Sequence, residues 1–220
     1  MTLTLFHTAA VHIATFDVLL AEIAPDVPVR HVVDEALLRA ARDEGRMTPD
    51  MTRRVGEQLL VALGGDTDVL LCTCSTIGGA VEEQGRNAAV PVLRIDRPMA
   101  EHAVAIGEHI AILAALQSTL GPTHALLEDA ARKAGRDVSI SEILCDGAWP
   151  LFERGDTAAY YENLAQHIDH AADTHDVIVL AQASMAPAAT LRPNLRVPVL
   201  SSPRIGLQAA VAAYRRQRAA

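Results

Sequence analysis

The sequence predicts an α/β fold of two similar lobes, each a mostly parallel sheet flanked by helices. Short apolar, β-branched runs alternate with longer helical patterns, which is the order of successive βαβ units. Residues 69–71 and 177–180 are apolar throughout, as expected of strands that helices cover on both faces. Half of the 220 residues are hydrophobic, so the chain has enough apolar material for a sizeable core.

Each element follows from a local pattern. The apolar runs predict strands at residues 3–6, 27–33, 69–73, 92–95, 110–114, 138–144, 177–181 and 197–200. The stretches with helical periodicity predict helices at residues 36–42, 50–63, 97–106, 121–134, 156–174 and 204–218.

Helix-terminating residues support several of these boundaries. Thr48 is suited to cap a helix whose first residue is Pro49. The pair Gly121-Pro122 predicts the start of another helix in a similar way, and Gly135 predicts its end.

The chain contains an internal repeat. Residues 68–76 have a counterpart in residues 176–184, and an ungapped alignment places Cys74 opposite Gln182. This repeat predicts a first lobe of residues 1–95 plus 200–220 and a second of residues 96–199. Ligands of such sheets collect at the carboxyl ends of strands, so the active site is expected in a cleft between the lobes. The alternative is that any two buried parallel strands resemble one another.

Composition excludes several classes of protein. The formal net charge is −8 and aromatic residues make up 3% of the chain, which argues against a nucleic-acid partner. No apolar run reaches the roughly 18–20 residues of a membrane span, and the first residues do not resemble a signal peptide. Three cysteines fit a reducing compartment. We therefore expect a cytoplasmic protein without a membrane partner.

Cys74 is the first candidate for a catalytic residue. It lies where a buried strand meets a turn, and Ser75 and Thr76 follow it. A helix starting there would direct free N–H groups at a thiolate or at a substrate carboxylate. The alternative is a small buried cysteine that only fills the core, which is also our interpretation of Cys72. The C-x-C spacing does not predict a metal site.

Three stretches carry a resemblance to a known family. Residues 69–76 resemble the first cysteine motif of the aspartate/glutamate/hydantoin racemase superfamily. Residues 177–187 resemble its second motif, and residues 112–118 resemble a strand that leads to a carboxylate-binding threonine. Residues 91–96 and 198–203 also suit this layout, so the resemblance covers nearly the whole chain.

The resemblance implies a cofactor-independent enzyme that moves a proton at the carbon next to a carboxylate. In that family one thiolate removes the α-proton and a second thiol delivers a proton to the opposite face. Hydroxyl and N–H donors around the carboxylate stabilise the transition state. This sequence has Gln182 at the second cysteine position, and an amide is neither an acid nor a base near neutral pH.

Three interpretations follow from the missing thiol. Another group acts on the second face, for which His7 is our leading candidate because of its pKa range, with Thr8 beside it. Alternatively Cys74 works alone, as a single cysteine does in the family's malonate decarboxylases, although theirs lies in the second motif. In the third interpretation the chain binds a small carboxylate without turnover.

The remaining candidates are substrate-binding groups: Thr8, Ser75, Thr76, Ser118, Gln182, Ala183 and Ser184. Each polar side chain at a strand end has a structural alternative, because Gln182, Ser118 and Ser184 are equally suited to cap backbone groups. Cys145 precedes an Asp-Gly pair that is more typical of a turn. His167 and His170, one helical turn apart, are expected on a solvated face.

We therefore predict a cofactor-independent racemase or isomerase of small carboxylates with Cys74 as its single catalytic thiol. The alternatives are a decarboxylase or lyase of the arylmalonate decarboxylase type, and a non-catalytic carboxylate-binding protein. No cofactor and no metal are expected. Apolar helices in excess of what one sheet covers favour a homodimer, but the sequence does not establish the oligomeric state.

Overall fold

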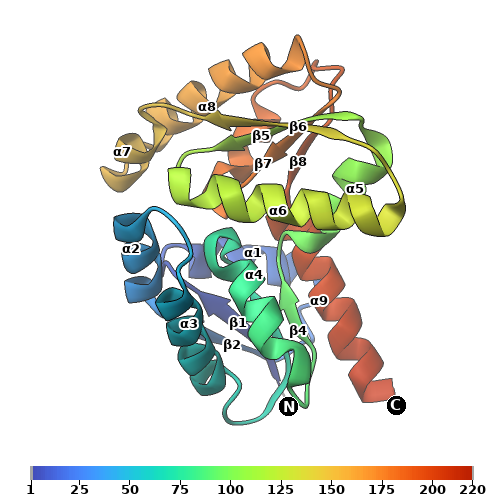
Figure 1. Cartoon of the computed structure of the whole chain (residues 1–220). Helices are drawn as coiled ribbons and strands as arrows, with labels where there is room; N and C mark the ends of the chain where they lie inside the picture. Colours follow the sequence, from blue (N-terminus) through green and yellow to red (C-terminus); the bar gives the residue numbers. More distant parts are fainter. Residues whose placement is uncertain (1, 220) are drawn as a thin grey trace. The chain divides into compact units, whose positions relative to one another are not determined.

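The computed structural model describes residues 2–219 (Figure 1). These residues form two compact units, residues 2–96 with 203–219 and residues 97–202. The expected boundaries near residues 95 and 200 lie close to these divisions. Each unit contains one four-stranded parallel sheet, so the predicted α/β class with two parallel sheets is confirmed.

The first unit is built on the strand order β2-β1-β3-β4. Its strands are β1 (Thr2–His7), β2 (Val29–Val33), β3 (Thr67–Cys72) and β4 (Val92–Arg94). Its helices are α1 (His12–Ile23), α2 (Glu35–Glu44), α3 (Pro49–Ala62), α4 (Ser75–Gln84), the short 3₁₀ helix η1 (Gly85–Asn87) and α9 (Ser202–Ala219).

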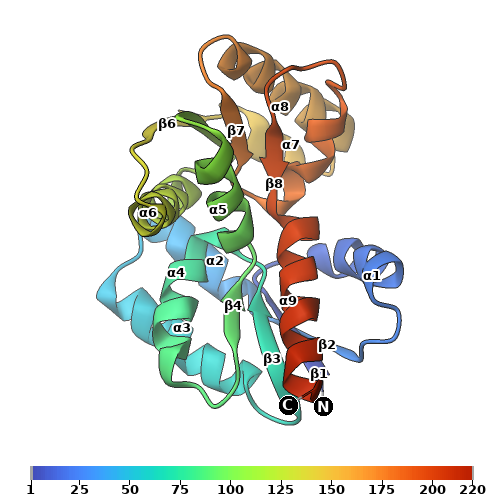
Figure 2. The same ribbon diagram turned by 90° about the vertical axis from the view of Figure 1, so that its right-hand side faces the viewer.

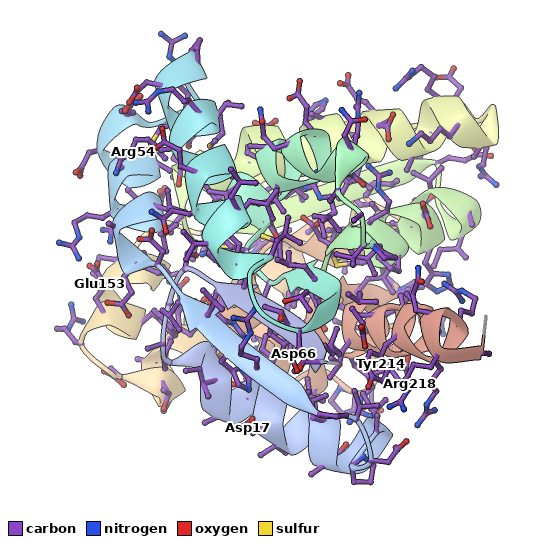
Figure 3. All side chains as sticks on the ribbon, turned by 90° about the horizontal axis from the view of Figure 1, so that it is seen from below. Asp17, Arg54, Asp66, Glu153, Tyr214 and Arg218 are labelled. Atoms are coloured by element: carbon purple, nitrogen blue, oxygen red, sulfur yellow. The ribbon has the colours of Figure 1, made fainter. Side chains whose placement is uncertain are left out.

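Helices cover both faces of this sheet. On one face, residues of α1 and α9 pack with Leu3, Leu5, Val69 and Leu71 of the strands. On the other face, residues of α2, α3 and α4 pack with Phe6, Leu70 and Cys72. Figure 2 shows α9 running along the strands of this unit. On α9, Arg218 donates a hydrogen bond of 3.1 Å to the Tyr214 hydroxyl one turn earlier (Figure 3).

The second unit repeats the design with the order β6-β5-β7-β8. Its strands are β5 (His109–Ala114), β6 (Ser139–Leu144), β7 (Val177–Leu180) and β8 (Val199–Ser201). Its helices are α5 (Arg97–Ile106), α6 (Gln117–Ala134), α7 (Ala148–Glu153), α8 (Thr157–Ala172) and the 3₁₀ helix η2 (Ala183–Thr190). Buried residues of α7, α8 and η2 pack on one face of the strands.

The internal repeat corresponds to equivalent strands of the two sheets. Thr73 N–H donates to the Phe6 carbonyl of β1, and Ala181 N–H donates in the same way to the Leu113 carbonyl of β5, both at 2.9 Å. Strands β3 and β7 therefore occupy the same place in their sheets, as the sequence repeat predicts.

All eight predicted strands are present, but some helix predictions need correction. Helix α6 begins at Gln117, so Gly121-Pro122 lies inside it rather than at its start. Proline is favoured in a first turn but tolerated later when the loss of one backbone hydrogen bond is offset by packing. Helices α1, α4 and α7 are missing from the predicted ranges, although a helix starting after Cys74 was considered. None of the helices within residues 2–219 is both long and apolar enough to cross a membrane.

Candidate active site

Cys74 lies at the junction of β3 and α4. It is the residue that precedes the first turn of α4, in an extended conformation (φ −112°, ψ 115°), and its side chain is partly exposed. The first turn of α4 therefore begins directly after the cysteine, so its free N–H groups and the positive end of the helix dipole lie near the sulfur. Cys72, two residues earlier, is fully buried and is a core residue, as predicted.

The groups nearest to the Cys74 sulfur are hydrogen-bond donors. Burial raises the pKa of the thiol, and this is the largest effect on it. The Thr8 hydroxyl, the N–H groups of Ile77 and Thr76 and the Thr76 hydroxyl act in the opposite direction and lower this pKa. Without a bound ligand Cys74 is therefore a protonated thiol at neutral pH. The surrounding hydrogen-bond donors would stabilise the negative charge of a thiolate.

Thr8, Ser75 and Thr76 are buried beside Cys74 in the first unit, so the structure brings these four predicted residues together. Thr8 comes from the end of β1, and Ser75 and Thr76 form the first residues of α4. Two adjacent parallel strands thus supply the thiol and its hydroxyl neighbours from their carboxyl ends.

His7 has a different environment from the one we expected. Its side chain is fully buried. Its Nδ1 is 2.8 Å from the Thr73 hydroxyl and its Nε2 is 2.9 Å from His31 Nδ1. Burial, followed by the influence of His31 and His12, lowers its pKa to about 3. A neutral imidazole with both nitrogens engaged is not placed for direct proton transfer to a substrate, so this geometry argues for a positioning role.

His31 extends this network to the surface. Its Nε2 is 3.1 Å from a carboxylate oxygen of Asp17, an exposed residue of α1 that is labelled in Figure 3. The planes of the His7 and His31 rings are within 13° of parallel, and their centroids are 5.1 Å apart. Sequence reasoning missed His31 and Asp17, because neither residue lies in a motif.

The predicted residues of the second unit lie at the carboxyl ends of β5 and β7. Ala181 separates Gln182 from the end of β7 at Leu180, and Gln182 precedes Ala183, the first residue of η2. Its Oε1 accepts hydrogen bonds from the N–H groups of Ala115 (2.7 Å) and Leu116 (3.1 Å). The Gln182 oxygen therefore caps two backbone N–H groups, which is the structural alternative that the sequence analysis gave for this residue.

The two serines of this unit differ in their partners. The Ser184 hydroxyl is 2.9 Å from the hydroxyl of buried Tyr160. Ser118 is the second residue of α6 and does not cap it, since Leu116 holds the capping position. Its hydroxyl is buried without a hydrogen-bond partner among the described residues.

The other candidates are structural. Cys145 is buried at the end of β6, where Gly147 adopts the left-handed conformation of the predicted Asp-Gly turn. Burial, and then the nearby Asp146, raise the pKa of its thiol to about 12. His167 and His170 each contact the carbonyl four residues earlier on α8. Within residues 2–219 no group of histidine, cysteine and acidic side chains has the arrangement of a metal site.

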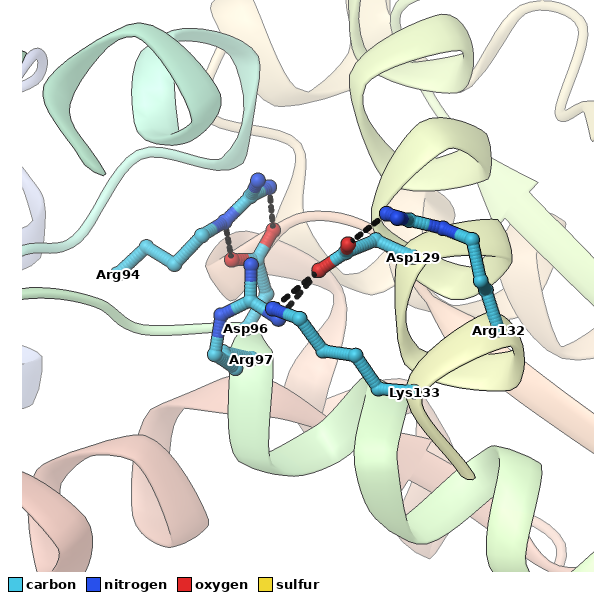
Figure 4. Close-up of polar contacts among 6 residues, drawn as sticks. All are labelled: Arg94, Asp96, Arg97, Asp129, Arg132 and Lys133. Carbon is cyan, nitrogen blue, oxygen red and sulfur yellow. Dashed lines mark hydrogen bonds and ion pairs between the residues drawn. The ribbon is translucent and has the colours of Figure 1, made fainter. Parts of the chain in front are cut away.

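Each unit also contains a cluster of charged side chains. Arg94 and Asp96, both buried, form a bidentate pair at 2.7 and 2.9 Å (Figure 4). The Arg94 guanidinium lies against Gly78 of α4, where an added Cβ would be 3.1 Å from its Nε. In the second unit Asp129 pairs with Arg97, Arg132 and Lys133 (Figure 4).

A two-sheet α/β fold with a thiol at a strand end is what the racemase resemblance of the sequence implies. The family model described as Asp/Glu/hydantoin racemase matches residues 49–210. The chain therefore belongs to the Asp/Glu/hydantoin racemase family and is an isomerase of the racemase type. None of the curated proteins matches it in sequence.

Solved structures show the same fold at low identity. A glutamate racemase from Bacillus anthracis superposes with a TM-score of 0.71 at 14% identity, covering 98% of this chain and 82% of that one. An allantoin racemase from Pseudomonas fluorescens gives 0.66 at 19%, covering 98% and 91%. The aspartate racemase of Picrophilus torridus gives 0.68 at 13%, covering 99% and 95%.

Proposed function

We propose that this protein is a cofactor-independent racemase or isomerase that moves a proton at the carbon next to a carboxylate, with Cys74 as its single catalytic thiol. The observation that carries the proposal is the setting of Cys74 at the start of α4, where donors from Thr8, Thr76 and Ile77 partly offset the rise that burial causes in the pKa of its thiol. Gln182 stands at the equivalent strand end of the other sheet, and its amide is neither an acid nor a base near neutral pH.

The proton transfer has a simple balance. The Cys74 thiol first releases its proton to solvent. The thiolate then removes the α-proton and becomes a thiol, while the negative charge passes to the substrate carboxylate as an enediolate. Return of a proton from Cys74 to the same face restores the starting configuration, and inversion requires a proton from solvent water on the opposite face. Ser75, Thr76 and Thr8 of the first unit are proposed as substrate-binding groups, and Ser118, Ala183 and Ser184 are the candidates that the second unit offers. The substrate is a small carboxylate, and we further propose a cytoplasmic homodimer.

The protonated state of Cys74 favours a second candidate. A thiol whose pKa is raised by burial is ready to donate a proton at the outset. In a decarboxylase of the arylmalonate type, loss of CO₂ leaves an enediolate that the thiol protonates. The same residue thus supports a lyase if the substrate carries a second carboxylate on its α-carbon.

Proton NMR in D₂O tests these proposals. The protein is incubated with a panel of amino acids, hydantoins, hydroxy acids and substituted malonates, and chiral chromatography follows the products. Loss of an α-proton signal with racemisation supports the racemase, whereas loss with retained configuration shows proton exchange on one face without racemisation. CO₂ release identifies the decarboxylase.

Two variants complete the design. Cys74→Ala should abolish the exchange, while Cys145→Ala removes a buried thiol at another strand end and should retain it. If no compound exchanges its α-proton, or if Cys74→Ala exchanges as fast as the wild type, Cys74 is not the catalytic thiol. A chain that binds the compounds without exchange would then be a carboxylate-binding protein.

A further inference from the structure

Gln182 occupies the position in the second sheet that Cys74 occupies in the first. One residue separates each of them from the end of its strand, and each directly precedes the first residue of a helix. Both backbones are extended, with φ −112° and ψ 115° at Cys74 and φ −127° and ψ 142° at Gln182. The replacement of a thiol by an amide therefore occurs at a strand end where parallel α/β sheets bind ligands.

The orientation of the Gln182 amide is determined by its neighbours. Two backbone N–H groups, of Ala115 and Leu116, donate to the same side-chain atom. That atom must be the oxygen, because the amide nitrogen carries only donors. The –NH₂ group is consequently directed away from these two N–H groups, and no hydrogen bond of Nε2 is found among residues 2–219. The side chain is partly exposed, so a ligand has access to it.

A second polar group near this strand end also lacks a partner. Ser118 lies two residues after Leu116 and is only 6% exposed. Its hydroxyl has no hydrogen-bond partner among the described residues. Buried hydroxyls are nearly always hydrogen-bonded in folded proteins. Gln182 and Ser118, which follow the carboxyl ends of β7 and β5, thus each have a polar group without a hydrogen-bond partner among the described residues.

We infer that the Gln182 –NH₂ group is a fixed donor to an anionic oxygen of the bound substrate, and that Gln182 is a specificity-determining residue. The inference rests on the proposed function and deepens it. The substrate must present an acceptor, such as a carboxylate or enediolate oxygen, at this position, and a substrate that presents an ammonium group there is rejected. Gln182 stabilises developing negative charge without exchanging a proton.

A purely structural role predicts something different. If Gln182 only links the end of β7 to the N–H groups after β5, then any acceptor of the same shape would replace it. Gln182→Glu separates the two roles, because glutamate has the same size and keeps an acceptor for both N–H groups. It substitutes an oxygen for the donor nitrogen. Gln182→Ala removes the acceptor and the donor together and serves as the comparison.

The experiment uses the full chain labelled with ¹⁵N and sodium malonate as the probe. The Gln182 side-chain –NH₂ signals are identified by their absence from the Gln182→Glu spectrum. Malonate should shift these signals saturably, and Gln182→Glu should bind malonate about 10- to 100-fold more weakly, the range expected when a hydrogen bond to a charged group is lost. Its melting temperature should remain at the wild-type value, whereas that of Gln182→Ala should fall.

Acidification provides an internal rescue. Malonate affinity of Gln182→Glu, relative to the wild type at the same pH, should recover as the introduced carboxyl group is protonated and regains a donor. Unchanged malonate affinity in Gln182→Glu, or –NH₂ signals that do not move in the presence of malonate, would overturn the inference.

The same titration in Cys74→Ala separates this inference from the proposed function. Malonate should still shift the Gln182 signals in that variant, because binding does not need the thiol. If α-proton exchange fails with the whole panel while Gln182-dependent binding persists, the proposed function falls and the inference stands. If α-proton exchange depends on Cys74 but Gln182→Glu binds malonate as tightly as the wild type, the proposed function stands and the inference about Gln182 falls.

Discussion

Replacing His7 by glutamine should change how the stability of the protein depends on pH. His7 is fully buried and its pKa is lowered from 6.5 to about 3. In the unfolded chain the imidazole takes up a proton below pH 6.5, while in the folded chain it stays neutral until about pH 3. The stability contributed by the neutral ring is therefore complete above pH 6.5 and decreases as the pH falls towards 3.

The magnitude follows from the pKa difference. Each pH unit in this window costs about 1.4 kcal/mol of the free energy of unfolding. At about pH 5 the wild type should have lost about 2 kcal/mol more than His7→Gln, relative to their stabilities at about pH 7. Urea denaturation followed by far-ultraviolet circular dichroism measures this difference. His170→Gln replaces an exposed histidine and should follow the wild type.

Parallel stability curves for the wild type and His7→Gln would refute this reasoning. They would mean that the folded protein binds a proton at His7 as readily as the unfolded chain does. The hydrogen bonds with His31 and Thr73 would then favour the imidazolium strongly enough to offset burial.

Three further predictions concern single residues. Gly206→Ala should destabilise the protein severely, because its Cβ would lie 2.1 Å from the Ile95 carbonyl oxygen; thermal unfolding measures the loss. Asp96→Asn should cost about 3–5 kcal/mol of the free energy of unfolding, since it leaves the buried Arg94 guanidinium without a counter-charge. Iodoacetamide should modify one cysteine per folded chain, Cys74, with a rate that continues to rise above pH 9 because burial raises the pKa of the thiol.

Each of these predictions has a matched control. Gly121→Ala adds a methyl group with no heavy atom within 4 Å and should stabilise α6 by up to about 1 kcal/mol. Arg53→Ala removes exposed ion pairs with Asp50 and Glu57 and should change the free energy of unfolding little, because solvent screens such pairs. Mass mapping of the alkylated peptide assigns the cysteine. Equal losses for Asp96→Asn and Arg53→Ala, or modification at Cys145 as fast as at Cys74, would contradict the burial on which these predictions depend.

The strands were predictable because their sequences are locally unambiguous. A run such as Val177–Leu180 is apolar at every position and fits a strand covered on both faces. Helix α1 was missed because it lacks the usual signals: Val11 precedes it without a side-chain cap, and several of its exposed positions are apolar, Val18 among them. Gly121 and Pro122 misplaced the start of α6 because they fit a helix start locally, whereas tertiary packing determines where the helix begins.

The site was predictable to a similar extent. Cys74 and its neighbours in the chain were found from their position after a strand, and Thr8 from its position after another. The network of His7, His31 and Asp17 was not found, since it depends on the register of β1 with β2 and on the placement of α1. The occupied oxygen of Gln182 likewise depends on tertiary contacts, which a local sequence pattern does not determine.

The path of the chain between the two units has a consequence for its synthesis. The second unit is one uninterrupted segment, residues 97–202, whereas the first unit is completed only by α9. Leu207, Val211 and Tyr214 of α9 belong to the core that covers one face of the first sheet. On the ribosome, the second unit is therefore free to fold while the first still exposes apolar surface, and α9, which is made after the second unit, closes the unit that carries the Cys74 thiol.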